Sequence, residues 1–325
     1  MHVGRDHVKS ALSSGKKFVT FAGTETLMYF IWGRELREFA AFEILDDEEA
    51  WTRLGEELLM PIAKSCSDNG LGLLTDALVW RASPDYIEKL GYKPADLNRV
   101  NEQAIKMVKQ YVTDWRGESG VGNDASPAII NAELGPRGDG YKTSEISVDA
   151  AREYHMAQIR ALADTEVDMV TALTMTSVNE TVGMILAAKA CGMPIGVSPT
   201  VETDGSLPEG SMALGDFIDQ VDQATDGYAA FFMVNCAHPD HLNPTLKAAK
   251  DRGASWLKRF KGVRANASRM SHEELDNAEK LDRGNPTEWA SLVCEMGNAF
   301  DLPILGGCCG TDAEHVQHLA KACKS

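Results

Sequence analysis

The sequence lacks any apolar run long enough to cross a membrane. Its longest apolar stretch, from Val182 to Val197, is interrupted by Lys189 and Pro194, so it is too short and too polar to span a bilayer. The first 17 residues carry charges and no apolar core, which argues against a secretory signal. A cytoplasmic location follows as an expectation. In that reducing compartment, the seven cysteines indicate metal binding or catalysis more than disulfides.

Basic residues are scarce: 32 Lys and Arg stand against 48 Asp and Glu, a formal net charge of −16. Such a chain repels phosphates, which excludes nucleic acid as an expected partner. The acidic excess serves solubility, or it gives a negative site mouth that attracts a cationic substrate. The phosphate-binding patterns GxGxxG and GxxxxGK[ST] are both absent, which weakens a nucleotide-binding doubly wound sheet as the alternative fold.

Short apolar runs alternate with helical spacing along the whole chain, with no repeat or composition break. Eight strands in this arrangement predict a single-domain (β/α)8 TIM barrel over residues 1–325. Helices are expected at 48–64, 150–162 and 180–191, and the polar stretch 268–285 is expected to be a helix and a long loop. The predicted strands are 17–22, 71–79, 127–133, 167–173, 194–198, 229–235, 262–266 and 303–307.

The strongest chemical signal is the run Leu305-Gly-Gly-Cys-Cys-Gly-Thr311. Adjacent cysteines in a regular strand point to opposite faces. The flanking glycines let the backbone leave strand geometry and aim the sulfurs of Cys308 and Cys309 into one space. The end of a barrel strand is also where active sites are built. Taken alone, the pair could still be two small buried residues.

Cys236 ends an apolar strand two barrel positions earlier, so it lies on the same rim. Three thiolates that leave a fourth position open are typical of a catalytic zinc site. Cys236, Cys308 and Cys309 are therefore the predicted Zn²⁺ ligands and catalytic residues. His238 and His241 are weaker candidates, because the intervening Pro239 and Asp240 predict a helix start. The remaining cysteines, in helical patterns, are expected to be inert: Cys66, Cys191, Cys294 and Cys323.

At these residues the chain resembles the homocysteine S-methyltransferase family. Residues 306–311 with His315 match its GGCCGT…H segment, and 234–236 match its GxNC segment. Weaker matches are 23–25, 134–139, 167–168 and 265–267. The resemblance implies a zinc-binding barrel that moves a methyl group from a sulfonium, ammonium or folate-type donor to a thiol. The substrate-binding positions that it implies are Gly23, Thr24, Leu173, Asn235 and Asn266.

The chain departs from that family at two acidic positions that hold the amino group of homocysteine, which are Val19 and Leu173 here. An ammonium facing an apolar wall is costly. The metal chemistry is therefore expected to be kept with a different thiol, one lacking the α-amino group. The alternative is that Glu25, Asp76 or Glu133 supplies the missing charge.

The expected partners are a small-molecule thiol acceptor and a small methyl donor. Aromatic residues near early strand ends, Phe21, Tyr29 and Trp80, could line a pocket for a cationic donor at about 0.5–2 kcal/mol per contact, or be plain core. Two competing functions stay open: a zinc-binding barrel without transfer activity, and a folate- or corrinoid-coupled shuttle. The donor, the acceptor and the oligomeric state stay open as well.

Overall fold

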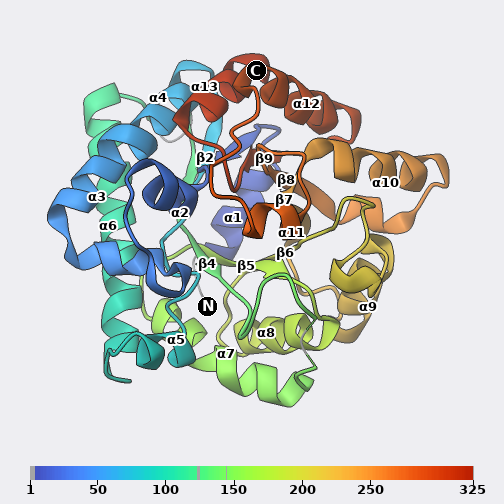
Figure 1. Cartoon of the computed structure of the whole chain (residues 1–325), viewed down its shortest axis with the longest axis horizontal. Coiled ribbons are helices and arrows are strands. Elements are labelled where there is room, and N and C mark those ends of the chain that lie inside the picture. The colour runs from blue at the N-terminus through green and yellow to red at the C-terminus, as the bar shows by residue number, and fades with distance from the viewer. Residues whose placement is uncertain (1–3, 123–124, 144, 325) are drawn as a thin grey trace.

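A computed structural model describes residues 4–122, 125–143 and 145–324 and forms a barrel of strands inside a ring of helices (Figure 1). In these residues one sheet runs in the order β3-β2-β1-β9-β8-β7-β6-β5-β4, and all its neighbours pair in parallel. The predicted (β/α)8 fold is thereby confirmed. The strands are β1 (Phe18–Thr20), β2 (Gly72–Leu74), β3 (Ala128–Ile129), β4 (Asn131–Leu134), β5 (Met169–Met175), β6 (Ile195–Pro199), β7 (Phe231–Ala237), β8 (Phe260–Ala265) and β9 (Ile304–Gly307).

One barrel position is shared by two short strands. β3 pairs with β2 and β4 pairs with β5, and only Ile130 separates the two pieces. The nine strands therefore fill eight positions, and each predicted strand segment overlaps an observed strand. The segment 71–79 shortens to β2, because the chain leaves strand geometry beyond Leu74.

The helices cover the outside of the barrel and confirm the three predicted helices (Figure 1). The helix predicted at 48–64 is built from three consecutive pieces, and the stretch 268–285 holds one short helix and a loop, as expected. The longer elements are α3 (Glu48–Leu54), η4 (Gly55–Leu59), α4 (Met60–Asp68), α6 (Asp96–Ser119), α7 (Val148–Ala163), α8 (Val178–Ala190), α9 (Leu214–Thr225), α10 (Pro239–Asp251), α12 (Pro286–Ala299) and α13 (Ala313–Ala322). The shorter ones are α1 (Gly4–Leu12), α2 (Thr24–Thr26), η1 (Leu27–Ile31), η2 (Arg37–Phe39), η3 (Ala41–Asp46), α5 (Pro84–Lys89), η5 (Pro208–Gly210), η6 (Ser255–Lys258) and α11 (His272–Asp276).

The barrel interior has an apolar lower layer. Alternate residues of the strands point inward, and Phe18, Met169, Phe231 and Ile304 form one buried cluster with Val8 of α1. Helix α1 lies at the centre of the ring in Figure 1 and closes this end of the barrel. The sequence did not predict this helix.

The upper layer of the interior is polar. Asn131 and Glu133 lie two residues apart on β4, so they share its inward face. Thr171 of β5 donates a hydrogen bond to Asn131 (2.7 Å). Arg264 of β8 forms an ion pair with Glu133. This polar layer lies toward the carboxyl ends of the strands, where barrel active sites form.

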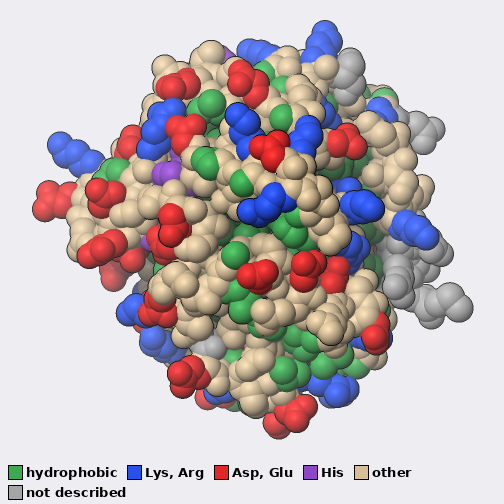
Figure 2. Space-filling model, turned by 90° about the vertical axis from the view of Figure 1, so that its right-hand side faces the viewer, with side chains coloured by type: hydrophobic (Ala, Val, Ile, Leu, Met, Phe, Trp, Pro, Cys, Tyr) green, Lys and Arg blue, Asp and Glu red, His purple; other side chains and the backbone are tan. Residues whose placement is uncertain are grey.

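Side chains of both charge signs are spread over the side of the molecule that α9 and α10 cover (Figure 2). In the part of the chain that the structure describes, no helix is both long and apolar enough to cross a bilayer.

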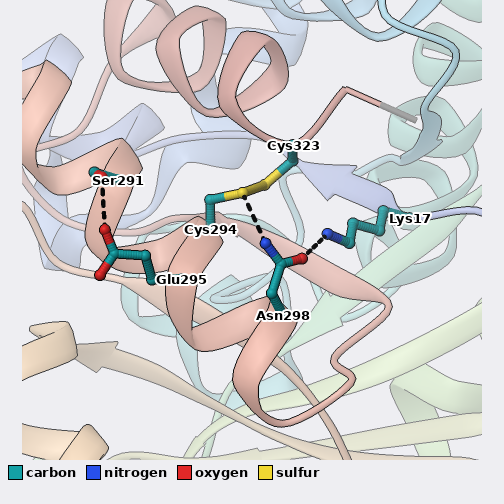
Figure 3. Close-up of a disulfide and its surroundings, with 6 residues drawn as sticks. All are labelled: Lys17, Ser291, Cys294, Glu295, Asn298 and Cys323. Atoms are coloured by element: carbon teal, nitrogen blue, oxygen red, sulfur yellow. Dashed lines mark hydrogen bonds between the residues drawn. A yellow bond between two sulfur atoms is a disulfide. The ribbon is translucent and has the colours of Figure 1, made fainter.

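Helices α12 and α13 are joined by a disulfide between Cys294 and Cys323 (Figure 3). The expectation that these two cysteines are inert was wrong. Each lies in or beside a different helix, and only the packing of α12 against α13 brings their Cα atoms to 5.7 Å, a separation that suits a disulfide. Asn298 connects the bridge to Lys17, because its amide contacts the Cys294 sulfur and accepts a hydrogen bond from the lysine ammonium (Figure 3).

Reducing this disulfide is expected to lower the free energy of unfolding by about 3 kcal/mol, because it closes a loop between residues 29 apart in sequence. Denaturant unfolding with and without dithiothreitol measures the effect. The double variant Cys294→Ala/Cys323→Ala should not respond to dithiothreitol, whereas Cys191→Ala should respond like the wild type. Equal stability of the wild type in both conditions would contradict the prediction.

Candidate metal centre and active-site cavity

A cavity of about 520 Å³ opens at the carboxyl ends of the strands. Its walls contain every residue that the sequence predicted for the site: Gly23, Thr24, Leu173, Asn235, Cys236, Asn266, Cys308 and Cys309. Segments remote in the chain thus meet in one space. Which of these residues touches a substrate stays a prediction.

The three predicted ligand sulfurs converge on one wall of the cavity. The sulfurs of Cys236, Cys308 and Cys309 all lie within 4.8 Å of one another, and those of Cys236 and Cys308 are 2.7 Å apart. Cys308 and Cys309 follow β9 in a tight turn, in which the Thr311 amide donates to the Cys308 carbonyl (3.1 Å) and Gly310 has φ 79°. Glycine adopts this left-handed geometry without strain, which is how adjacent cysteines come to share one space.

The donor set fits a zinc ion. Three cysteine sulfurs leave one of the four positions of Zn²⁺ open, and two ligands of one tetrahedral zinc lie about 3.8 Å apart, so Cys236 and Cys308 would separate by about 1 Å on binding.

Hydrogen bonds from Cys308 and Cys309 lower the pKa of Cys236 well below its usual value. The same contact with Cys236 raises the pKa of Cys308 to about 12. The contacts among the three thiols therefore favour the anion on Cys236.

Asn235 fixes the strand ends beside the sulfurs. Its Oδ1 atom accepts from the Thr174 amide (2.9 Å) and the Ser198 hydroxyl (2.7 Å). Its Nδ2 atom donates to the Thr174 hydroxyl (2.9 Å) and the Cys236 sulfur (3.2 Å). Thr174 and Cys236 have φ values of 60° and 56° at register shifts of β5 and β7. Because a left-handed backbone is strained for such residues, Asn235 acts here as a positioning residue.

The carbonyl of Cys236 is held by two further donors. Asn266 donates to it from Nδ2 (3.1 Å) and His272 from Nε2 (2.7 Å). The Asn266 side chain is 3% exposed, and its Oδ1 atom has no hydrogen-bond partner among the described residues. Tyr141 lowers the pKa of the Cys236 thiol, and its ring centroid lies 4.4 Å from that of His272. Tyr141 and His272 were not predicted from the sequence, because their segments carry no recognisable motif.

Gly23 lies where the loop after β1 meets the cysteine turn. A Cβ atom at this position would stand 2.6 Å from the Cys308 carbonyl oxygen and 2.5 Å from the Thr26 hydroxyl. The Gly23 amide donates to the Thr311 carbonyl (3.2 Å), and the Gly310 amide donates to the Thr26 hydroxyl (3.1 Å). The resemblance to the family at Gly23 thus reflects close contact between the backbone of the loop after β1 and that of the cysteine turn.

A charged cluster forms another wall of the cavity. Arg264 bonds to Glu133, lies 3.1 Å from Asp76 through Nη2, and donates from Nε to the Gly307 carbonyl (3.4 Å). The side chains of these three charged residues are 4–8% exposed. Asp76 and Glu133 were among the alternatives predicted from the sequence, whereas Arg264 was not predicted. A charged residue two positions after Gly262, on the inward face of an otherwise apolar strand, was the available signal.

The carboxyl groups of this wall have raised pKa values. Burial raises the pKa of Glu133, with a further rise from the nearby Asp76, although Arg264 opposes both. Burial likewise raises the pKa of Asp76. Glu25, the next acid along the wall, has its pKa raised to about 7 by burial and by the proximity of Cys308 and Asp76. Three carboxyl groups therefore share one guanidinium.

Val19 does not face this cavity. Its side chain is 1% exposed and packs in the core between barrel and helices, because the alternation of β1 turns it outward and Thr20 inward. The expectation that Val19 contributes to the substrate wall was wrong, whereas Leu173 does line the cavity. Of the aromatic candidates, Tyr29 and Trp80 line it, while Phe21 is buried against Tyr111.

The histidines suggested by the sequence serve local structure. His238 begins α10, accepting a hydrogen bond from the Asp240 amide (3.2 Å), and His241 contacts the Arg269 carbonyl (3.0 Å). His315 bonds to Asp312 (2.8 Å), which caps the start of α13 directly after the cysteine turn. Asp312 also forms an ion pair with Arg283. His315 thus stabilises the cysteine turn through Asp312 and does not face the cavity as a ligand.

Comparison with known proteins gives one consistent result. The family model described as homocysteine S-methyltransferase matches residues 77–323. The homocysteine methyltransferase MmuM from Escherichia coli has a similar structure. Its metallated form has a TM-score of 0.72 at 15% identity over 98% of both chains. Its oxidized form has a TM-score of 0.72 at 15% identity over 94% of this chain and 96% of that one.

Replacing Gly23 by alanine is expected to weaken zinc binding by roughly 10–100-fold, the range found when residues that orient metal ligands are changed, because its Cβ would displace the cysteine turn. Competition with a chromophoric chelator measures the affinity. Gly55→Ala is the matched control, since no atom lies within 4 Å of its added Cβ. An unchanged zinc affinity in Gly23→Ala would refute this role of the glycine.

Replacing Asp312 by asparagine is expected to cost about 2 kcal/mol of unfolding free energy at pH 7. Burial alone would raise the pKa of Asp312, but the bonds to His315 and the charge of Arg283 lower it to about 2. The stabilisation is therefore present above the unfolded value near 3.8 and is lost as the pH falls through 3 toward 2. Urea unfolding as a function of pH measures it. The difference between variant and wild type should shrink below pH 4, and Asp251→Asn should show none.

Proposed function

Since this chain belongs to the homocysteine S-methyltransferase family, we propose that it is a zinc-dependent S-methyltransferase acting on a small thiol. One observation carries the proposal: the sulfurs of Cys236, Cys308 and Cys309 meet within 4.8 Å at the edge of a cavity large enough for two small substrates. Zinc held there would supply a Lewis acid that converts a thiol with a pKa of roughly 8.5 into a nucleophilic thiolate at neutral pH.

The chain's own residues orient the ligands of that centre. Asn235 hydrogen-bonds the Cys236 sulfur, which fixes its direction, and Asn235 and Tyr141 both lower the pKa of that thiol. The charge of Arg264 lowers the pKa of Cys308, against the contact with Cys236 that raises it. Fixed hydrogen-bond donors in the cavity replace the water that would surround a thiolate in solution. Fewer dipoles then have to reorient as the methyl group is transferred.

The acceptor thiol and the methyl donor both have room in the cavity. The donor methyl carbon must lie in line with the acceptor sulfur, so the two substrates must bind together. Tyr29 and Trp80 offer aromatic surface for a cationic donor, worth about 0.5–2 kcal/mol per good contact. One face of Trp80 is already covered by the Arg81 guanidinium at 3.9 Å.

Purified protein should contain about one zinc per chain, and Cys309→Ser should lose it together with activity, with transfer falling more than about 100-fold. Elemental analysis measures the metal, and mass spectrometry of reactions with an isotopically labelled donor measures transfer. The control is Cys191→Ser, a free cysteine away from the cavity. Protein that takes up no zinc would overturn the proposal. Zinc without transfer across a panel of donors and thiols would favour a binding protein.

A further inference from the structure

The walls of the cavity carry more negative than positive side chains. Six acidic residues line it, against three basic ones: Glu25, Asp76, Glu133, Asp139, Asp276 and Asp282 against Arg81, Arg264 and Lys280. A zinc ion with three thiolates would add a further negative charge. Because charges in a partly enclosed cavity are weakly screened, the site as a whole favours a cationic ligand.

Arg264 does not supply the missing charge to a ligand. Its Nη1 atom bonds to Glu133 and Asp76, its Nη2 atom lies 3.1 Å from Asp76, and its Nε atom bonds to the Gly307 carbonyl. A guanidinium has five N–H donors, and these contacts occupy most of them. Arg264 is thus an internal counter-ion, and a substrate carboxylate would have to compete with two buried acids for it.

Among the described residues, Glu25 is the carboxylate of this wall that lacks a side-chain partner. It lines the cavity and interacts electrostatically with Arg264 and Asp76, but no hydrogen bond or ion pair to another side chain is formed in the described structure. A second acceptor points to the same kind of ligand. Asn266 lines the cavity, and its buried Oδ1 atom has no donor among the described residues. An N–H-bearing cation would satisfy it.

We propose, on the basis of the function proposed above, that Glu25 with the Asp76–Arg264–Glu133 cluster forms a cation subsite that determines substrate specificity. The ligand is a small cation, either the ammonium group of an amino-thiol acceptor or the onium centre of the methyl donor. The free acceptor on Asn266 favours the ammonium. The apolar side chain of Leu173 on the cavity wall is then compensated by acids from other strands, and the thiol keeps its amino group.

Two ligand pairs that differ in charge test this subsite by calorimetry on the zinc-loaded protein. Homocysteine against 4-mercaptobutanoate removes only the amino group of the acceptor. Glycine betaine against 3,3-dimethylbutanoate replaces only the cationic nitrogen of a donor by carbon. The variants are Glu25→Gln, which removes the charge and keeps the shape, and Glu35→Gln, an exposed glutamate outside the cavity.

Glu25→Gln is expected to weaken binding of the member of one pair that carries the cationic group at least tenfold, while binding of the partner that lacks this group stays within twofold. Glu35→Gln should change neither. An effect on the homocysteine pair assigns the subsite to the acceptor, and an effect on the betaine pair assigns it to the donor. The subsite is refuted if the wild type does not prefer the probe with the cationic group in either pair, or if Glu25→Gln weakens binding of the probes with and without this group equally. Zinc content and methyl transfer are measured on the same samples. If the protein transfers methyl groups but does not prefer the cationic ligands, only the subsite is refuted. If it prefers the cationic ligands but transfers no methyl group, only the proposed function is refuted.

Discussion

The backbone geometry around Cys236 is the constraint on which the site depends. A sulfur from β7 reaches the turn after β9 only because Cys236 adopts φ 56° at a register shift. Such a residue costs of order 1–3 kcal/mol. Asn235 offsets that cost with a fully used amide, and Asn266 and His272 hold the Cys236 carbonyl. The strain is therefore held by groups that themselves line the cavity.

The period of two along the strands explains why the site is polar only at one end. Phe18, Phe231 and Ile304 fill the lower interior against α1. Two residues further along their strands, the inward positions bring Thr20, Met233 and Gly306, and beyond them the cysteine turn begins. The room needed at the top comes from small residues, since a Cβ on Gly306 would stand 1.9 Å from the Thr20 hydroxyl. Apolar packing below thus supports chemistry above.

The sequence predicted what depends on local pattern: the strands, the barrel and the glycine-flanked Cys308–Cys309 turn. It did not predict what depends on register across strands. Val19 occupies the position expected from linear matching, yet alternation turns it away from the cavity. Arg264 pairs with Glu133, which lies 131 residues away in the sequence. Cys294 forms a disulfide with Cys323 only because two helices pack together. No spacing rule encodes such pairs, because each requires the closed barrel first.

The Asp76–Arg264–Glu133 cluster is hard to explain by stability alone. Removing charges from water costs several kcal/mol per ion, and apolar residues of similar volume often stabilise a core as well or better. Most inward positions of this barrel are in fact apolar or hydroxyl-bearing. The cluster lies where the interior opens into the cavity, with two acids to one guanidinium and Glu25 beside them. Its excess negative charge therefore faces the cavity, as the proposed cation subsite requires.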